Sequence, residues 1–441
     1  MGKKRVQDIV RIPLENIESG NSIKQLMSDT IQREHKIKRD TIFQEDMALI
    51  SQYIEASDFM TDEDMGRAEN LIERYYAAAH PSLDNPDAIP FADKVMLFDS
   101  LFRPQFGPVE NPSFTFIDLF AGIGGFRQAM QSLGGQCVFA SEIDSMARAT
   151  YTHNYCAVPY GDITLNSTKS HIPEQFNILC AGFPCQAFSQ AGLRQGFLDE
   201  TRGTLFFHVA DIIEHFEPDA FFLENVKGLL SHDGGHTIEV IMGRLRELNY
   251  FVPDPQVVNA MNFGVPQNRE RVFIVGFHNR TGVQEFQYPA PTDTSKRFRD
   301  VKEEEVVDVK YYLSQRYWQT LVNHKKRHRS AGNGFGYEII GDDDIANTFL
   351  AGAMGREHNL VIDPRQTQIL PATKLKGETN EDFVRTLTPR EAAGLQGFPR
   401  NFVFPVSDYA AYKQIGNSVA VPAVKETGRC VLEKLGIPII E

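Results

Sequence analysis

The chain has 441 residues and a formal net charge of −13 at pH 7, with 45 Lys and Arg against 58 Asp and Glu. This length exceeds the usual size of one domain, so two or three compact units are expected. The acidic balance argues against a protein covered by nucleic acid, because phosphate contacts need concentrated Lys and Arg. No apolar run approaches the roughly 20 residues that span a bilayer, so no membrane segment is expected.

The cysteines and the first residues point to one cellular compartment. The segment MGKKRVQDIV lacks the apolar stretch that follows in a signal peptide, so export is not expected. The cysteines are odd in number and form no C-x-x-C pair, which disfavours a disulfide framework and a zinc knuckle. They are Cys137, Cys156, Cys180, Cys185 and Cys430. A cytoplasmic protein with free thiols and no bound metal is predicted.

Residues 1–110 are expected to form a helical N-terminal extension. Apolar residues recur near helical spacing in residues 23–37, 45–56 and 62–79. Three prolines and one glycine in residues 103–114 then predict a linker. The acidic character of the helical segments favours a module that packs against or positions the rest of the chain.

From Phe114 onward, short apolar runs alternate with longer helical ones, which is typical of a parallel sheet with crossover helices. A crossover helix is expected within residues 201–218, ended by Pro218. The alternation is lost after Phe277, so residues 279 to 385 predict a second, less regular domain. A C-terminal amphipathic helix is expected to pack back on the sheet. The candidate strands are 114–120, 137–142, 176–182, 220–226 and 271–277.

The first strand runs into the glycine-containing turn AGIGGF at residues 121–126, which suits either a close ligand or a purely structural turn. Glu142 ends the next strand, where a carboxylate can accept hydrogen bonds from the ribose of a nicotinamide or adenosylmethionine cofactor. The turn lacks the third glycine of G-x-G-x-x-G, which disfavours a dinucleotide. Asp162 could accept a hydrogen bond from an adenine amino group or serve as a turn residue.

Three further features fall at the edge of the sheet where ligands bind. Cys185 follows an apolar strand in the loop AGFPCQAFSQAG, and it is either a buried free thiol or a nucleophile. Glu224 and Asn225 end another apolar strand. Arg269 and Arg271 share one face of an extended segment, where they could hold an anion or lie on the surface. A thiol beside a carboxylate suits nucleophilic catalysis with acid assistance.

A basic stretch lies in the irregular region. Residues 310–329 contain six Lys or Arg, two His and no acidic residue. They form either a solvated helix face or a phosphate-binding stripe. His324 and His328 are four residues apart and could ligate a metal on a helix, but among Lys and Arg a phosphate contact is favoured.

In this order, the motifs resemble the bacterial DNA (cytosine-5)-methyltransferases of restriction-modification systems, from Phe114 to the C-terminus. The motifs are DLFAGIGGF, E-I-D, GFPCQAFS, ENVKGLL, QNRERVFIVGF, TPREAAGLQGFP and QIGNSVAVP. The resemblance implies an α/β fold with a Rossmann-like, adenosylmethionine-dependent methyltransferase domain at 111–290, completed by 405–441. It implies a smaller, irregular target-recognition domain at 291–404, braced by residues 388–399.

The resemblance also implies roles for individual residues. The catalytic residues would be Cys185, Glu224, Arg269 and Arg271. The residues around S-adenosylmethionine would be Phe120, Gly122, Ile123, Gly125, Glu142, Ile143, Asp162, Ile163, Pro184, Leu205, Asn417 and Val419. The DNA-contacting residues would be Gln186, Ser189, Lys325, Lys326, Arg327 and Arg329.

The implied partners are double-stranded DNA and a cognate restriction endonuclease that acts on the same site without a stable complex, with the chain itself a monomer in the bacterial cytoplasm. The segments HKKRH and GNGFGYEI are similar to recognition regions for sites that begin with two cytosines. Since every implied cofactor residue lies after Phe114, the N-terminal extension is expected to be dispensable for cofactor binding.

Three alternatives have to be distinguished from this function. A nicotinamide oxidoreductase would need the full dinucleotide glycine spacing and has no use for the P-C-Q loop. A DNA-binding regulator without catalysis is opposed by the intact Cys185, Glu224 and Arg269. Methylation of tRNA, as in one branch of the family, is disfavoured by the sizeable variable region.

Overall fold

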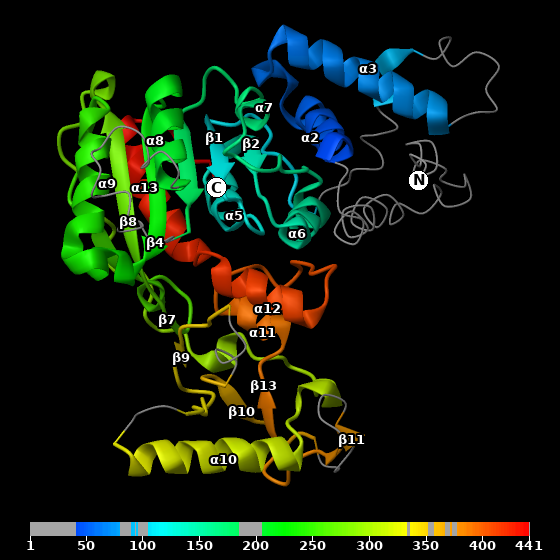
Figure 1. Cartoon of the computed structure of the whole chain (residues 1–441), viewed down its shortest axis with the longest axis vertical. Coiled ribbons are helices and arrows are strands. Elements are labelled where there is room, and N and C mark those ends of the chain that lie inside the picture. Colours follow the sequence, from blue (N-terminus) through cyan, green and yellow to red (C-terminus); the bar gives the residue numbers. More distant parts are fainter. Residues whose placement is uncertain are drawn as a thin grey trace.

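A seven-stranded sheet forms the centre of the larger domain in this computed structural model (Figure 1). The structure describes residues 41–79, 90–92, 94–95, 105–184, 205–332, 336–351, 357–366, 371–372 and 377–440. The strand order is β2-β1-β3-β4-β8-β5, with β6 also paired to β8. The bounds are β1 Phe114–Leu119, β2 Gly135–Ser141, β3 Ile178–Gly182, β4 Ala220–Val226, β5 Tyr250–Phe251, β6 Gln256–Asn259 and β8 Glu270–His278.

The sheet is mixed, and the expectation of an all-parallel sheet is wrong for β8. Strands β1 to β4 run parallel, whereas β8 is antiparallel to β4, β5 and β6. Only residues 260–269 connect β6 to β8, and a parallel connection needs a crossover of roughly a dozen residues or more. The β8 strand therefore returns beside β6 in the opposite direction, which alternating hydrophobicity alone does not reveal.

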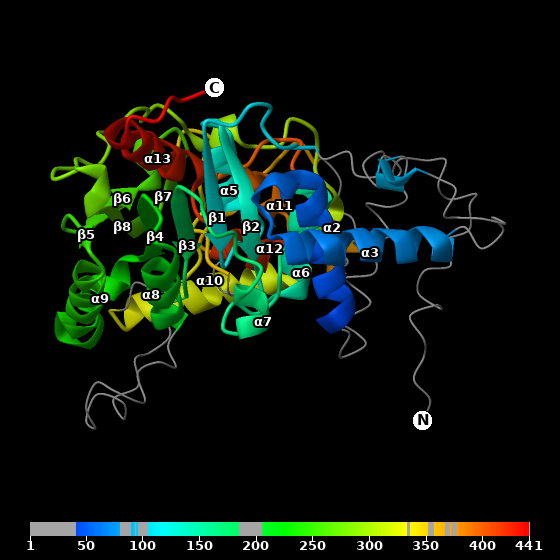
Figure 2. The same cartoon turned by 90° about the horizontal axis from the view of Figure 1, so that it is seen from above.

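Helices cover both faces of the sheet (Figure 2). One face, which carries Phe116 and Phe222, packs against α5 Gly125–Gln131, α6 Ser145–Tyr155 and α13 Val421–Leu435. The opposite face, which carries Ile117 and Phe221, packs against α8 Leu205–Phe216 and α9 His236–Glu247. Neighbouring residues on one strand point to opposite faces, so both faces of the inner strands are apolar. The short α7 spans Asn166–Lys169.

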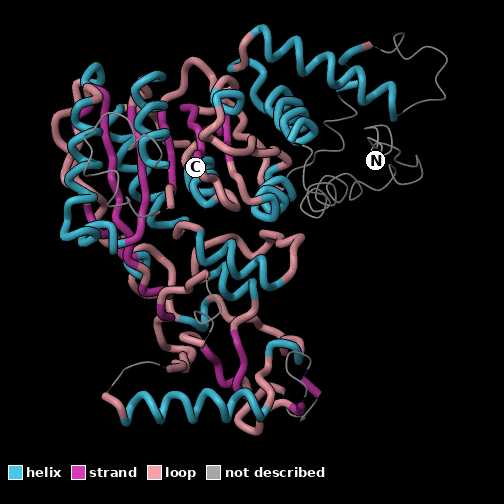
Figure 3. The backbone as a smooth tube through the Cα atoms, viewed as in Figure 1, coloured by secondary structure: helices cyan, strands magenta, loops and turns pink. Residues whose placement is uncertain are grey.

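The smaller domain lies below the sheet in Figure 1 and contains little regular structure (Figure 3). Its strands pair as β10 with β13 and β11 with β12, and β9 pairs with β7 from the segment between β6 and β8 of the larger domain. Helices α11 and α12 lie between the sheet and the long helix α10. The bounds are β7 Gln267–Asn268, β9 Ala346–Asn347, β10 Leu360–Ile362, β11 Pro371–Ala372, β12 Gly377–Glu378, β13 Val384–Thr386, α10 Gln315–Ser330, α11 Pro389–Gly394 and α12 Asp408–Asn417.

A buried ionic network lies in the smaller domain, beside the apolar cluster of Trp318, Leu360 and Val384. The guanidinium of Arg385 lies 2.8 Å from both Asp363 Oδ2 and Glu391 Oε2. Glu391 also accepts a hydrogen bond from the backbone N–H of Thr388 in a capping box at the start of α11. Paired charges of this kind are tolerated in an interior because hydrogen bonds satisfy them on both sides. The network ties residues 388–391 to β10 and β13.

The described part of the N-terminal extension contains the helices α2 Thr41–Ala56, which lies beside the edge strand β2, and α3 Asp62–Ala79, which packs on α2. These confirm the helices expected at residues 45–56 and 62–79, while the expected helix at 23–37 lies outside the described residues. None of the helices in the described ranges is both long and apolar enough to cross a bilayer.

Candidate active site

The turn after β1 adopts a backbone conformation that few residue types tolerate. Phe120, Gly122 and Gly124 have φ values of 56°, 57° and 86°. A positive φ costs little for glycine but is strained for phenylalanine, and such strain concentrates at functional sites. A Cβ atom on Gly125 would lie 2.7 Å from a methyl carbon of Val419. The turn is thus packed directly against the chain between α12 and α13.

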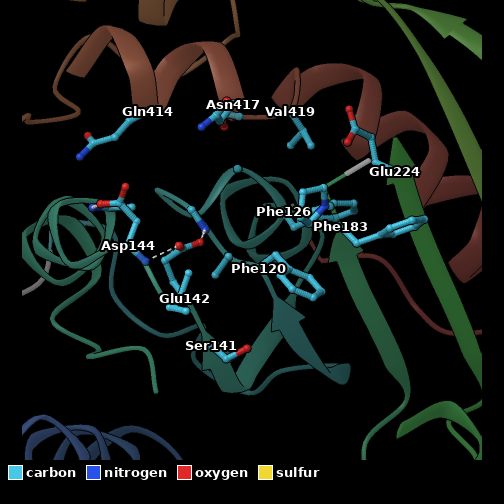
Figure 4. Close-up of a pocket in the computed structure, with 18 of the residues that line it drawn as sticks. Phe120, Phe126, Ser141, Glu142, Asp144, Phe183, Glu224, Gln414, Asn417 and Val419 are labelled. Atoms are coloured by element: carbon cyan, nitrogen blue, oxygen red, sulfur yellow. Dashed lines mark hydrogen bonds between the residues drawn. The ribbon is translucent and has the colours of Figure 1, made fainter. Parts of the chain in front are cut away.

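Glu142 holds this turn from the end of β2. Its Oε2 accepts a hydrogen bond from the Gly122 N–H at 2.8 Å, and its Oε1 accepts one from the Asp144 N–H at 2.7 Å (Figure 4). Burial raises the pKa of Glu142, while these two hydrogen bonds oppose the shift. Each carboxylate oxygen keeps acceptor capacity beyond one bond, so Glu142 can also accept from ligand hydroxyls.

A pocket of 680 Å³ opens at this edge of the sheet, within the size range of cofactor sites. Ile143, 67% exposed, lies at the pocket and offers an apolar contact for a planar ring. Asp162 lines the pocket and also accepts a hydrogen bond from the Thr164 N–H, so it is a turn residue as well. The expected cofactor residues that line the pocket are Phe120, Gly122, Gly125, Glu142, Ile143, Asp162, Ile163, Pro184, Leu205, Asn417 and Val419.

Ile123 is the expected cofactor residue whose side chain does not line this pocket. It is buried in the apolar cluster between the sheet and α5. Several lining residues were in turn not among those expected from the sequence, namely Phe126, Asp144, Phe183, Lys413 and Gln414. All belong to the quoted motifs or directly precede one, so the signal was present. Lys413 and Asp144 form an ion pair of 2.9 Å between the C-terminal segment and the start of α6.

Glu224 and Arg271 form an ion pair at the other end of the same pocket. Arg271 Nε lies 3.0 Å from Glu224 Oε1, and their side chains are 14% and 10% exposed. Burial raises the pKa of Glu224, and the positive charges of Arg271 and Arg269 oppose this. In Figure 4, Glu142 and Glu224 lie apart, with Phe126 and Val419 between them. The pocket therefore extends from Glu142 and the glycine turn to Glu224, a carboxyl group whose pKa burial raises.

Arg269 lines the pocket, but its hydrogen bonds differ from those of Arg271. Its guanidinium donates to the carbonyls of Phe349 at 3.1 Å, Gly416 at 3.1 Å and Ser418 at 2.6 Å. These carbonyls belong to the smaller domain and to the end of α12 with the residue after it. The arginine pair is therefore divided, with Arg271 facing Glu224 and Arg269 connecting backbone segments.

Cys185, Gln186 and Ser189 lie outside the described residues. Pro184 and Leu205, the described residues on either side of them, both line the pocket. The carbonyl of Phe183 accepts a hydrogen bond from the Asn225 side chain at 2.9 Å. This bond fixes the chain leaving β3 against the end of β4, next to Glu224.

The basic residues of α10 are not equivalent. The ammonium of Lys325 donates to the Tyr337 carbonyl at 2.6 Å and to Glu338 Oε1 at 3.1 Å, whereas Lys326, Arg327 and Arg329 are exposed. The rings of His324 and His328 lie 4.3 Å apart, centroid to centroid. Within the described ranges, no group of three or more His, Cys, Asp or Glu is arranged to hold a metal ion.

The helix-covered sheet and the pocket at the carboxyl edge of its parallel strands define a Rossmann-like α/β domain with a ligand-sized cavity. The family model for C-5 cytosine-specific DNA methylases matches residues 114–433. Type II methyltransferase M.HpaII of Haemophilus parainfluenzae is 62% identical over 338 residues, which are 76% of this chain and 94% of that protein. Type II methyltransferase M.DsaV of Dactylococcopsis salina is 43% identical over 75% of this chain and 89% of that protein.

Among solved structures, the S. pombe Dnmt2 methyltransferase shares the fold, with a TM-score of 0.53 and 19% identity over 74% of this chain and 99% of that one. The chain belongs to the C-5 cytosine-specific DNA methylase family. It is a DNA (cytosine-5)-methyltransferase of the restriction-modification type, which confirms the resemblance, the fold class and the enzyme class inferred from the motifs.

Proposed function

We propose that this enzyme flips a cytosine out of a specific duplex site and methylates its C5 through a covalent adduct between Cys185 and C6. The observation that carries the proposal is the pocket that joins Glu142 and the glycine turn to the Glu224–Arg271 pair. Pro184, the residue before Cys185, lines the same pocket. An acid and a site for a nucleoside in one cavity, with a nucleophile next in sequence to a lining residue, suit group transfer to a base.

The described residues fit S-adenosylmethionine as the methyl donor. The Glu142 carboxylate suits the ribose hydroxyls, Ile143 offers an apolar surface for the adenine, and Asp162 can accept from its amino group. When bound, S-adenosylmethionine supplies an electrophilic methyl group carried on a sulfonium. Burial of this group in the pocket excludes water, which competes with the cytosine for reaction.

Cys185 and Glu224 together activate the base, each at a different ring atom. Cytosine C5 is a poor nucleophile, and addition of the Cys185 thiolate to C6 gives it the electron density to take up a methyl group. Glu224 donates a proton or a strong hydrogen bond to N3, which its raised pKa favours near neutral pH. Arg271 orients the Glu224 carboxyl. The methyl transfer would leave the donor sulfur as a neutral thioether. Loss of the C5 proton to a base, return of the N3 proton to Glu224 and expulsion of the thiolate then restore the aromatic ring.

We assign DNA binding to the smaller domain and to the segment that contains Cys185. A stacked base cannot reach the pocket, so the target nucleotide must leave the helix, at a cost of a few kcal/mol. Phosphate contacts by Lys326, Arg327 and Arg329 offset this cost, and Gln186 and Ser189 contact the DNA near the flipped base. Residues 291–404 select the site, for which we propose a sequence that begins with two cytosines.

The domain division and the partners follow from the same proposal. Residues 111–290 with 405–441 form the catalytic unit, residues 291–404 the recognition unit and residues 1–110 the extension. A restriction endonuclease with the same site, acting without a stable complex, is the proposed partner of a monomeric, cytoplasmic enzyme.

Methylation mapping tests this function directly. Plasmid DNA and tRNA are incubated with the purified chain and S-adenosylmethionine, and both are sequenced at base resolution for 5-methylcytosine. We expect methylation at one cytosine of a short duplex site, and none with Cys185→Ser. Modification of tRNA alone, or of DNA without sequence preference, would contradict the proposal.

A further inference from the structure

The N-terminal helix α2 covers the edge strand β2. The side-chain amide of Gln52 donates to the carbonyl of Val138 at 3.0 Å. Val138 has no partner on β1, because the register between β1 and β2 shifts there at a β-bulge. The hydrogen bond from Gln52 therefore satisfies a backbone carbonyl at the bulge. Ala48 and Ala56 pack in the same apolar cluster as Val138. An exposed edge strand is a liability that α2 removes, and Figure 2 shows the two elements side by side.

From this position α2 places a carboxylate against the helix that follows the cofactor turn. Both oxygens of Glu55 accept hydrogen bonds from Arg127 Nη2, at 3.1 and 3.0 Å. The side chains of Arg127 and Glu55 are 2% and 11% exposed. Arg127 lies on α5, which begins at Gly125. Within the described part of the chain, Glu55 is the carboxylate that forms an ion pair with Arg127, and a buried guanidinium without one is strongly destabilising.

Arg127 also contacts Tyr155, a residue that is hydrogen-bonded to the glycine turn. Its guanidinium carbon lies 4.7 Å from the centre of the Tyr155 ring. The Tyr155 hydroxyl donates to the Gly124 carbonyl at 2.9 Å. A Cβ atom on Gly124 would lie 2.3 Å from a ring carbon of Tyr155. The ring is therefore in close contact with the left-handed glycine of the turn.

We infer that Glu55 is a positioning residue for cofactor binding, and that the N-terminal extension supports the turn at residues 120–124 through Arg127 and Tyr155. This inference rests on the proposed cofactor site. It revises the expectation that the extension is dispensable for cofactor binding. The family model begins at residue 114, and the aligned region already covers 94% of M.HpaII. Helix α2 therefore lies outside the residues that the family model matches.

Two substitutions in the full-length chain test the inference. Glu55→Gln keeps the shape but removes the charge that neutralises Arg127. Tyr155→Phe keeps the ring but removes the hydroxyl bound to Gly124. Glu69→Gln is the matched control, because Glu69 pairs with Tyr53 on the exposed side of the same two helices. The measurements are S-adenosylhomocysteine affinity by calorimetry, KM for S-adenosylmethionine and for DNA, kcat, and Tm.

We expect Glu55→Gln and Tyr155→Phe to weaken S-adenosylhomocysteine binding about tenfold, with a matching rise in KM for S-adenosylmethionine. KM for DNA and kcat should stay at the wild-type level, and Glu69→Gln should bind normally. A merely structural role would lower Tm and leave the KM of the folded fraction unchanged.

The outcomes separate the inference from the proposed function. If the wild type does not bind S-adenosylhomocysteine, the proposed cofactor site itself is wrong. If the wild type binds and Glu55→Gln binds equally well, the positioning role is overturned, whatever happens to Tm. An equal loss in Glu69→Gln would also overturn it, because the effect would then be general. Should Glu55→Gln not fold, Tyr155→Phe decides: unchanged affinity there refutes the coupling.

Discussion

Arg271 Nε lies 3.0 Å from Glu224 Oε1, in a pocket where burial raises the pKa of the carboxyl group. The two effects oppose each other, since the guanidinium favours the ionised carboxylate while burial favours the protonated acid. A group that must supply a proton to N3 near neutral pH needs this balance, because an unshifted carboxyl would already be ionised.

Glu224→Gln should lower the single-turnover methylation rate by about 10²- to 10⁴-fold, the range for loss of a general acid. The glutamine keeps the size of the side chain, so S-adenosylhomocysteine affinity should not change. Quench-flow measurements with saturating DNA and calorimetry would give the two quantities. Full activity in this variant would remove Glu224 from the chemistry.

Arg271→Gln should move the pH profile of methylation. Without the positive charge, the pKa of Glu224 rises further, so the fall in rate caused by its deprotonation should occur at higher pH than in the wild type. The matched control is Lys227→Gln, whose ion pair with Glu270 is exposed and should leave the profile in place. A downward shift in Arg271→Gln would show that Arg271 does not act on this carboxyl.

We expect the thermal stability of the protein to depend on pH through the titration of Asp118. It is fully buried in β1, and burial raises its pKa to about 8, against the opposing charge of Arg127. The pKa of Asp118 in the folded state lies above its ordinary value of 3.8. The protonated carboxyl group therefore contributes to the free energy of unfolding, and this contribution is fully present below pH 3.8. This contribution is lost as pH rises through about 8.

The wild-type Tm should therefore fall between about pH 4 and pH 8 and level off above that range, and Asp118→Asn should flatten this slope. Asp254→Asn, at an exposed carboxylate, is the control that should keep the slope. Scanning calorimetry across the pH range measures both. A slope that persists unchanged in Asp118→Asn would assign it to other groups.

Local patterns were enough to predict β1 to β4, β8 and the edge of the sheet that carries the pocket, but not the short strands β5 and β6. Strand β4 matches its expected range, and Glu142 and Glu224 line one cavity as their positions at strand ends suggested. Contacts between distant segments were not predictable. Glu55 and Arg127 are separated by 72 residues and meet only because α2 covers the edge of the sheet. Arg269 and Arg271 have the same sequence signal, yet different backbone surroundings give them different partners.

Lys326→Ala with Arg329→Ala should weaken DNA binding across all sequences and reduce the salt slope by about two, because each side chain neutralises one phosphate and displaces its counterion. Lys325→Ala is the informative comparison, because its ammonium is already engaged with Tyr337 and Glu338. Lys325→Ala should lower Tm and leave the salt slope nearly unchanged. Fluorescence anisotropy at several salt concentrations measures the slope, and an effect confined to the cognate site would mean that the residues contact bases.

Duplex DNA with 5-fluorocytosine at the target position should trap the enzyme, because fluorine cannot leave C5 as a proton does after methyl transfer. The Cys185–C6 bond then persists, so a denaturant-resistant complex should form only in the presence of S-adenosylmethionine. Peptide mapping should place the link on Cys185. Cys180 is fully buried in β3, and burial raises the pKa of its thiol well above the ordinary range, so it cannot compete as a thiolate. Cys185→Ser should abolish the adduct while preserving S-adenosylhomocysteine binding, because a serine hydroxyl is much harder to ionise. An adduct on another cysteine would assign the nucleophile elsewhere.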